Sequence, residues 1–250
     1  MMKVIAIIPA RFDSTRFPGK PLVKLGNKYI IQHVYEQAKK SGLFTEIIVG
    51  TDDQRIFEAV KGFGGKVTLT SKKHKSGTDR VAEVCTKLFC CKDADIIINI
   101  QGDEPFITEK PLKKLIEAFD DSEVMVASLM HKTSADIENP NVVKVVCDEN
   151  NNALNFSRIP SPEPRITNYK HIGVYAFRRK TLFEFVKLPE SKLEKIEKLE
   201  QLRLLENGYK IRMVLTSYKG IGIDTPQDLE KAEKLLTDTH RKTWIKERIF

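Results

Sequence analysis

Residues 5–20 read Ile-Ala-Ile-Ile-Pro-Ala-Arg-Phe-Asp-Ser-Thr-Arg-Phe-Pro-Gly-Lys, an apolar run followed by a basic loop. The β-branched run from Val4 to Ile8 predicts a buried strand that ends at Pro9. Arginine offers phosphate oxygens a fork of donors, lysine offers a point charge, and Gly19 allows close backbone approach. The segment therefore predicts a polyanion-binding loop, with an ordinary basic surface loop as the alternative. Its cations and hydroxyls are Arg11, Ser14, Thr15, Arg16 and Lys20.

This loop matches neither of the two best-known phosphate-binding motifs. No G-x-x-x-x-G precedes Lys20, and Pro21 stands where a P-loop has the Ser or Thr that holds the metal. The G-x-G-x-x-G turn of dinucleotide-binding folds is also missing from the loop. We therefore expect a phosphate-binding loop of another kind.

The composition predicts a protein with a substantial core. The 250 residues, 41% of them hydrophobic, suit one large domain spanning residues 1–250, or a domain with a small appendage. No run reaches the ~18 apolar residues of a membrane span, so we expect no membrane insertion. Met1-Met2-Lys3 leads into a strand rather than a signal peptide, and the four cysteines lack C-x-x-C spacing. Both features predict a cytoplasmic protein with free thiols.

The formal net charge of +8 predicts an anionic partner: nucleic acid, a membrane surface or a phosphorylated substrate. Much of the charge lies in mixed stretches such as residues 191–200, where Lys and Glu alternate as on a solvated helix face. A nucleic-acid-binding module is one alternative for the whole chain. Its basic stretches lack the interleaved aromatic residues that stack on bases, so we expect no nucleic-acid partner.

The first half of the chain alternates predicted strands and helices. This order predicts an α/β fold with a parallel sheet and helices on both faces. Ligands of such sheets bind beyond the carboxyl ends of the strands. The loops after Ile8, Thr70 and Gln101 should therefore converge on one crevice. Strands are expected at 4–8, 46–50, 66–70 and 95–101, and helices at 29–40, from Asp52 or Asp53 to 63, at 78–89 with Phe89 inward, and at 110–119.

Beyond Ser122 the pattern changes to strands joined by turns. Residues 148–152 (Asp-Glu-Asn-Asn-Asn) predict the turn of an antiparallel hairpin within a subregion at about 124–190. Thr225 is placed to cap a C-terminal helix that begins at Pro226. Strands are expected at 124–130, 142–147, 154–157, 171–177 and 210–216, and a helix at 191–206.

Two carboxylates have the placement expected of magnesium ligands. Asp103 follows a buried strand in Gln-Gly-Asp-Glu-Pro, and Asp224 precedes a helix in Gly-Ile-Asp-Thr-Pro. Mg²⁺ uses few protein ligands and takes the rest from phosphates and water. Helix capping or turn formation is the alternative role for each, and spacing alone leaves open whether the two side chains meet.

Two further patterns suggest binding residues. Ser76-Gly77-Thr78-Asp79-Arg80 opens a helix whose first N–H groups and hydroxyls can hold a base edge or a ribose, and Arg80 a phosphate. Many ordinary helices begin in the same way. His171 and Tyr175 share one strand face, as an ordinary core pair also would. With the predicted sheet and loops, these features indicate an enzyme of phosphoryl or nucleotidyl transfer.

Seven motifs, in order along nearly the whole chain, resemble those of the 3-deoxy-manno-octulosonate cytidylyltransferase family. The resemblance implies a Rossmann-like nucleotidyltransferase fold and the reaction of CTP with 3-deoxy-D-manno-octulosonate (Kdo) to give CMP-Kdo and diphosphate. This reaction serves lipopolysaccharide biosynthesis and requires Mg²⁺. The motifs are residues 8–22, 76–80, 99–105, 141–146, 171–175, 199–203 and 222–226.

The resemblance also implies a role for each matching residue. Arg16, Lys20 and Asp103 would be catalytic, and Asp103 and Asp224 would hold magnesium. The nucleotide would be bound by Ala10, Arg11, Ser14, Lys20, Ser76, Gly77, Arg80 and Gln101. The sugar acid would be bound by Arg16, Gln101, Arg158, His171, Tyr175, Glu200 and Gln201.

The antiparallel subregion at 124–190 would form a sugar-binding and homodimer interface in this family. Residues 159–170 form a shorter segment than in other members, so no role is assigned to Arg165. The alternative substrates on the same scaffold are a sialic acid and 8-amino-Kdo. Glu200-Gln201 and His171-Ile172-Gly173 favour Kdo-type sugars, by resemblance only.

Overall fold

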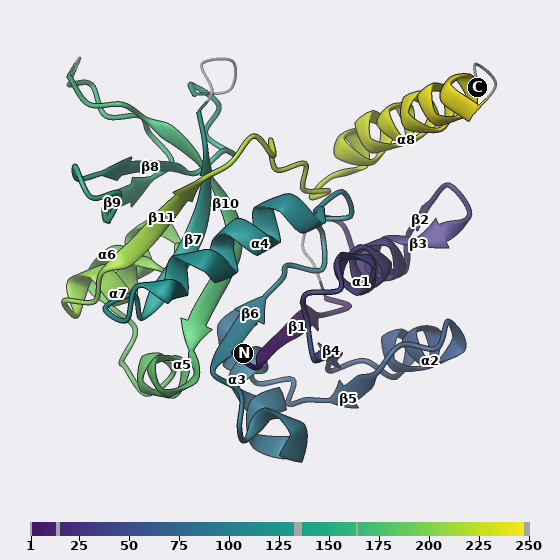
Figure 1. The fold of residues 1–250 in the computed structure, drawn as a ribbon, viewed down its shortest axis with the longest axis horizontal. Coiled ribbons are helices and arrows are strands. Elements are labelled where there is room, and N and C mark those ends of the chain that lie inside the picture. The colour runs from purple at the N-terminus through teal and green to yellow at the C-terminus, as the bar shows by residue number, and fades with distance from the viewer. Residues whose placement is uncertain (1, 14–15, 133–136, 164, 248–250) are drawn as a thin grey trace.

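The computed structural model describes residues 2–13, 16–132, 137–163 and 165–247. Within these residues, one nine-stranded sheet has the order β11-β7-β10-β6-β1-β4-β5, and the hairpin β8–β9 is attached to β10 (Figure 1). β1 pairs in parallel with both β4 and β6, as the alternation of strands and helices predicts. The predicted α/β architecture is confirmed.

The first half of the chain forms the parallel part of the sheet and its helices. Its strands are β1 (Val4–Ala10), β4 (Glu46–Thr51), β5 (Val67–Leu69) and β6 (Ile96–Asn99). Its helices are α1 (Ile30–Ser41), α2 (Gln54–Gly62), α3 (Gly77–Lys87) and α4 (Glu109–Glu117). Short elements connect them: η1 (Lys20–Leu22), β2 (Lys24–Leu25), β3 (Lys28–Tyr29), η2 (Phe89–Cys91) and η3 (Ala118–Asp120).

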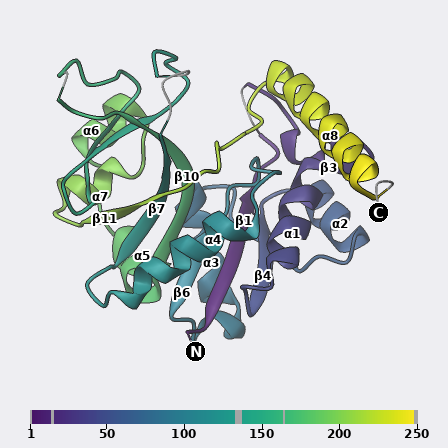
Figure 2. The same ribbon diagram turned by 45° about the horizontal axis from the view of Figure 1, so that its top comes forward.

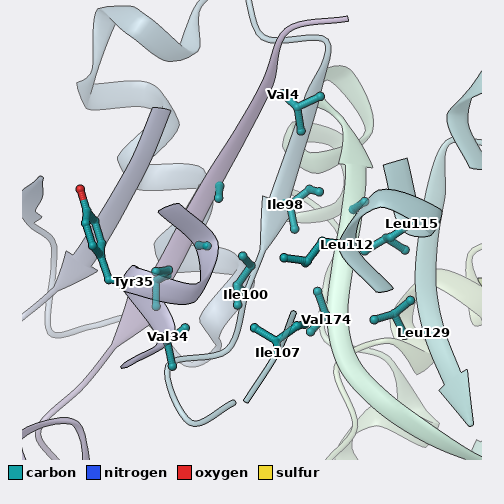
Figure 3. Packing of buried hydrophobic residues seen from close by; sticks show 14 of the residues in the cluster. Val4, Val34, Tyr35, Ile98, Ile100, Ile107, Leu112, Leu115, Leu129 and Val174 are labelled. Carbon is teal, nitrogen blue, oxygen red and sulfur yellow. The ribbon is translucent and has the colours of Figure 1, made fainter. Parts of the chain in front are cut away.

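The period of two in β1 divides the core between the faces of the sheet. Val4 and Ile8 face a cluster that includes side chains of α1 and α4, part of which Figure 3 shows. Ile5 and Ile7 face the opposite cluster, to which α3 contributes. Both faces of this central strand are therefore covered, which explains why its sequence is apolar without alternation.

The second half contributes an antiparallel strand to the same sheet. β10 lies antiparallel between β6 and β7, β11 runs parallel to β7, and the predicted hairpin β8–β9 pairs with the start of β10. The antiparallel subregion is thus continuous with the main sheet through β10. The strands of the second half of the chain are β7 (Val126–His131), β8 (Lys144–Cys147), β9 (Ala153–Ser157), β10 (Tyr169–Arg178) and β11 (Ile211–Leu215).

Three sequence expectations about helices were wrong. The helix expected at 191–206 is two short ones, α6 (Lys192–Glu197) and α7 (Leu202–Glu206), because the chain turns at Lys198 with φ of 57°. Phe89, expected inward, is 74% exposed because α3 has already ended at Lys87. The helix α5 (Arg179–Phe185) directly follows β10 and was not expected.

The last helix, α8 (Pro226–Glu247), begins where the sequence predicts. The Asp228 N–H donates to the Thr225 hydroxyl at 3.2 Å, and the Thr225 N–H donates to the Asp228 carboxylate at 3.0 Å. This reciprocal cap fixes the start of the helix. α8 lies beside the small hairpin β2–β3, on which Ala232 packs (Figure 2).

Among the residues that the structure describes, no helix combines the length and the apolar character needed to cross a bilayer.

Candidate active site

A cavity of about 1230 Å³ lies at the carboxyl ends of β1 and β6. The three loops predicted to converge all line it, through residues 9–11, 74–77 and 101–104. β10 and the turn between α6 and α7 supply the opposite wall. Because a pocket for one small ligand measures about 300–1,000 Å³, this volume suits two substrates side by side.

One end of the cavity is charged. Lys20 Nζ lies 2.6 Å from Asp103 Oδ2 and 2.9 Å from Asp224 Oδ1, and Arg16 Nη2 lies 3.0 Å from Asp224 Oδ2. Burial alone lowers the pKa of Lys20, but the two carboxylates outweigh it, so this pKa is raised. The pKa of Asp224 is lowered because the two cations outweigh burial. Two acids distant in sequence therefore meet at one ammonium group.

This arrangement fits a divalent cation. Both carboxylates direct an oxygen at one position, which is now occupied by the Lys20 ammonium group. Among the described residues, no third His, Cys, Asp or Glu joins them in a metal-binding group. Magnesium accepts such a set because it is commonly bound by one or two carboxylates with substrate phosphates and water.

The segment that carries Asp224 is tied to the Asp103 loop. The Ile223 N–H donates to the Asp103 carbonyl at 3.0 Å, and the Tyr218 hydroxyl donates to Glu104 at 2.6 Å. Burial raises the pKa of Glu104 to about 7. These two hydrogen bonds hold the segment that carries Asp224 against the loop that carries Asp103. Sequence reasoning missed the role of Glu104 and Tyr218, although Glu104 stands in the Gln-Gly-Asp-Glu-Pro motif.

The start of α3 forms another side of the cavity. The Asp79 N–H donates to the Ser76 hydroxyl at 3.1 Å and the Ser76 N–H to the Asp79 carboxylate at 3.2 Å, a complete capping box. Gly77 lies against Pro9 and Gln101, where an added Cβ would lie 3.4 Å from Pro9 Cγ. The predicted nucleotide residues of the strand end and of this helix start therefore lie side by side.

Four predicted nucleotide residues have different outcomes. Arg11 is exposed and lines the cavity. Arg80 also lines it, but the Arg80 guanidinium is buried and bonds to the Thr70 hydroxyl and, at 2.6 Å, to Asp52. In this structure Arg80 anchors α3 to the loops after β4 and β5. Ser14 lies outside the described residues. Ala10 lines the cavity.

A second side of the cavity lies along β10 and is polar. His171 and Tyr175 line the cavity from this strand, with ring centroids 5.4 Å apart. His171 Nε2 lies 3.0 Å from the Ser128 hydroxyl. Burial lowers the pKa of His171 to about 3 and raises the pKa of Tyr175. Both rings are therefore neutral near pH 7.

The turn between α6 and α7 completes this side. It places Glu200 and Gln201 in the cavity wall, where the Thr78 hydroxyl donates to Glu200 Oε1 at 2.7 Å. Burial raises the pKa of Glu200, against the opposing effect of the hydrogen bond from Thr78. The buried pair of Glu194 and Arg203 fixes the turn, with Arg203 Nε 2.8 Å from Glu194 Oε2.

Two arginines stand apart from these groups. Arg158 is not among the residues that line the cavity; its guanidinium donates to the carbonyls of Pro140 at 3.3 Å and Glu197 at 3.4 Å. Arg165 is exposed. Lys170, which sequence reasoning missed, lines the cavity and donates to the Gly220 carbonyl at 2.7 Å. Its position next to His171 in the motif was the available signal.

Comparison with known proteins gives consistent results. A family model described as cytidylyltransferase matches residues 5–211. Proteins of Thermodesulfovibrio yellowstonii and Bacteroides thetaiotaomicron, both named 3-deoxy-manno-octulosonate cytidylyltransferase, are each 50% identical to this chain. Each match covers 94% of this chain and 98% of the relative.

Solved structures agree with this result. The structure of a CMP:2-keto-3-deoxy-manno-octonic acid synthetase complexed with CTP has a TM-score of 0.89 and 44% identity, covering 95% of this chain and 99% of the other. A 4-diphosphocytidyl-2C-methyl-D-erythritol synthase from Anaerococcus prevotii has a TM-score of 0.66 at 17% identity, covering 94% and 99%, and shows the shared fold alone. The chain belongs to the cytidylyltransferase family, in its 3-deoxy-manno-octulosonate cytidylyltransferase group.

Proposed function

We propose that this protein activates Kdo by cytidylyl transfer: CTP and Kdo give CMP-Kdo and diphosphate for lipopolysaccharide biosynthesis. The observation that carries the proposal is the single cavity, which has a charged end around Lys20 and a polar end around β10 and the turn between α6 and α7. A triphosphate matches the first and a polyhydroxylated sugar acid the second. The names of the relatives support the same pair of substrates.

In the proposed reaction, the anomeric hydroxyl of Kdo attacks the α-phosphorus of CTP. One P–O bond forms to the sugar oxygen while the P–O bond to diphosphate breaks in line with it, and the hydroxyl proton passes to solvent. Catalysis of this kind consists mainly of positioning and charge neutralisation. Arg11, Arg16 and Lys20 line the end of the cavity where the triphosphate would lie.

Magnesium is the proposed cofactor, held by Asp103 and Asp224. Bound there, the ion neutralises phosphate charge and so lessens the repulsion of the attacking oxygen. Lys20 then has to exchange its carboxylate partners for phosphate oxygens. Its ammonium group can do so because lysine carries a flexible point charge rather than a fixed fork of donors.

The polar end of the cavity, around β10 and the turn between α6 and α7, is the proposed sugar site. Glu200, Gln201, His171 and Tyr175 line it and offer acceptors and donors to sugar hydroxyls. Arg158, held by backbone carbonyls outside the cavity lining, would have to turn inward to pair with the sugar carboxylate. We propose Kdo as the substrate, rather than 8-amino-Kdo or sialic acid, because the relatives with 50% identity are named for Kdo.

We further propose a cytoplasmic homodimer of single-domain chains that associate through the subregion 124–190. Large apolar side chains are exposed there and on the neighbouring α6: Leu154, Ile159, Ile166, Leu193 and Ile196. Such a group of apolar side chains favours a protein interface. Light scattering should give twice the chain mass, and a Leu154→Lys, Ile159→Lys variant should give the monomer mass; a wild-type monomer would contradict this proposal.

The function is tested by measuring diphosphate release from CTP with Kdo, 8-amino-Kdo or sialic acid, each with and without Mg²⁺. We expect release with Kdo that requires the metal. Absence of release with every 2-keto sugar acid would overturn the proposed function. Release only with 8-amino-Kdo would retain the reaction and change the substrate.

A further inference from the structure

Four side chains form a hydrogen-bonded chain from the nucleotide side of the cavity to the sugar side. Gln101 Nε2 donates to Asn99 Oδ1 at 3.1 Å, and Asn99 Nδ2 donates to Thr78 Oγ1 at 3.3 Å. Thr78 Oγ1 in turn donates to Glu200 Oε1 at 2.7 Å. The chain joins β6, the first turn of α3 and the turn between α6 and α7.

The two middle members are shielded from solvent. Asn99 is 0% and Thr78 is 1% exposed, whereas Gln101 and Glu200 at the two ends line the cavity. Burial matters because polar groups without competing water keep their hydrogen bonds in one arrangement. The outer members can meet a ligand, while the middle members cannot.

The carboxylate at one end determines the direction of every bond. Thr78 donates its single proton to Glu200 Oε1, so the Thr78 oxygen must accept from Asn99. Asn99 therefore turns its NH₂ group to Thr78 and its carbonyl to Gln101. Gln101 gives its NH₂ group to Asn99, which leaves its carbonyl oxygen for the cavity. Glu200 Oε2 is buried and has no hydrogen-bond partner among the described residues.

We propose that Thr78 and Asn99 are positioning residues that present Gln101 Oε1 and Glu200 Oε2 to the ligand as hydrogen-bond acceptors. The site then selects groups that donate, such as sugar hydroxyls, and disfavours isosteres that only accept. This inference rests on the proposed function, because it specifies how the proposed sugar site discriminates. It assigns no direct ligand contact to Thr78 or Asn99.

The test compares Thr78→Val, which keeps the side-chain shape but removes the hydroxyl, with Thr78→Ser, which keeps the hydroxyl. Thr86→Val is the matched control, because Thr86 also lies on α3 but bonds only to the Ala82 carbonyl of its own helix. Thr78→Ala is the second variant if the valine form does not fold. The KM values for Kdo and CTP are measured with kcat. Kdo affinity is measured by calorimetry in the presence of CTP with a methylene group between the α- and β-phosphorus.

Substrate analogues supply a readout that a purely structural role would not change. Each carries a single Kdo hydroxyl replaced by hydrogen or by fluorine, which cannot donate. The wild type should reject both replacements at the critical position, and Thr78→Val should lose much of this discrimination. We expect Thr78→Val to weaken Kdo binding by roughly tenfold to a hundredfold, the usual effect of losing a hydrogen bond to a charged group. The serine variant and Thr86→Val should resemble the wild type.

Unchanged Kdo affinity and analogue discrimination in Thr78→Val, or in Thr78→Ala if the valine form does not fold, would overturn the inference. Equal losses in the serine and valine variants would also overturn it, because the hydroxyl would then be irrelevant. Failure of the proposed function would give a different result, because the wild type itself would then release no diphosphate with Kdo.

Discussion

The two ends of the cavity are held by different kinds of interaction. At the charged end, Lys20 is shared by Asp103 and Asp224, and these ion pairs must be exchanged when a triphosphate and a metal ion enter. At the polar end, Thr78 and Asn99 form a buried hydrogen-bonded chain whose internal bonds do not have to be exchanged when a ligand binds. The comparison suggests that one end is rearranged by its ligand while the other is preorganised, so changes at the two ends should have different effects.

The largest expected effect comes from the charged end. Asp103→Asn or Asp224→Asn should each lower kcat by roughly 10²–10³-fold, because each removes a charge on which neutralisation depends. Diphosphate release at saturating substrates measures the loss, with circular dichroism to verify folding. Asp93→Asn, an exposed carboxylate on another loop, is the matched control. Near wild-type turnover in either site variant would remove that residue from the metal role.

Lys20→Met should separate catalysis from metal binding. We expect activity to fall about a hundredfold, since one cation at the reacting phosphates is lost. Mn²⁺ should nevertheless bind the nucleotide-free variant more tightly than the wild type, because no ammonium group then competes for the two carboxylates. Electron paramagnetic resonance of free Mn²⁺ measures this affinity. Weaker Mn²⁺ binding in the variant would contradict a shared position for lysine and metal.

A smaller effect concerns stability, and it contrasts Gly50 of β4, packed under α3, with Gly173 in the cavity wall. A Cβ on Gly50 would lie 2.7 Å from Val84 Cγ2 of α3, whereas a Cβ on Gly173 would lie 3.7 Å from Gln101 Cγ, an ordinary contact. Gly50→Ala should lower the free energy of unfolding by about 1–3 kcal/mol through overpacking. Gly173→Ala should change it little. Urea unfolding of both variants is the measurement, and equal losses would contradict the contrast.

The effect that is smallest near pH 7 is the pH dependence that His171 contributes at the polar end. Burial lowers the pKa of His171 from 6.5 to about 3. Below pH 6.5 the unfolded chain takes up a proton that the folded protein refuses until about pH 3. The stability from this neutral ring is therefore complete above pH 6.5 and declines as the pH falls toward 3, by at most about 1.4 kcal/mol per pH unit. His171→Gln should flatten the slope over that window; an unchanged slope would contradict the burial effect.

The sequence predicted the parallel half of the fold well because each element there has a local signal. The run from Val4 to Ile8 is apolar on both faces, and Asp53 caps α2 through the Arg55 N–H at 2.9 Å. The break between α6 and α7 had no such signal. Lys198 adopts a positive φ without being Gly or Asn, because tertiary contacts around the pair of Glu194 and Arg203 override local preference.

The candidate site was predictable in its members but not in their contacts. Motif resemblance named Asp103 and Asp224, but only the fold brings residues so far apart in sequence to one ammonium group. The same reasoning considered the hydroxyls of residues 76–80 as ligand contacts but did not predict that Thr78 and Asn99 bond to each other, because their partners come from three different elements. It also predicted Arg80 as a phosphate ligand without the knowledge that Asp52 already binds this arginine.

The central claim is that Asp103 and Asp224 share one divalent ion beside the phosphates of CTP. The most direct measurement is a crystal of the protein with Mn²⁺ and CTP, in which anomalous scattering locates the metal. We expect one manganese position about 2.1–2.2 Å from an oxygen of each carboxylate, with Lys20 turned to phosphate oxygens. A manganese peak that contacts only one of the two carboxylates, or neither, would contradict the account.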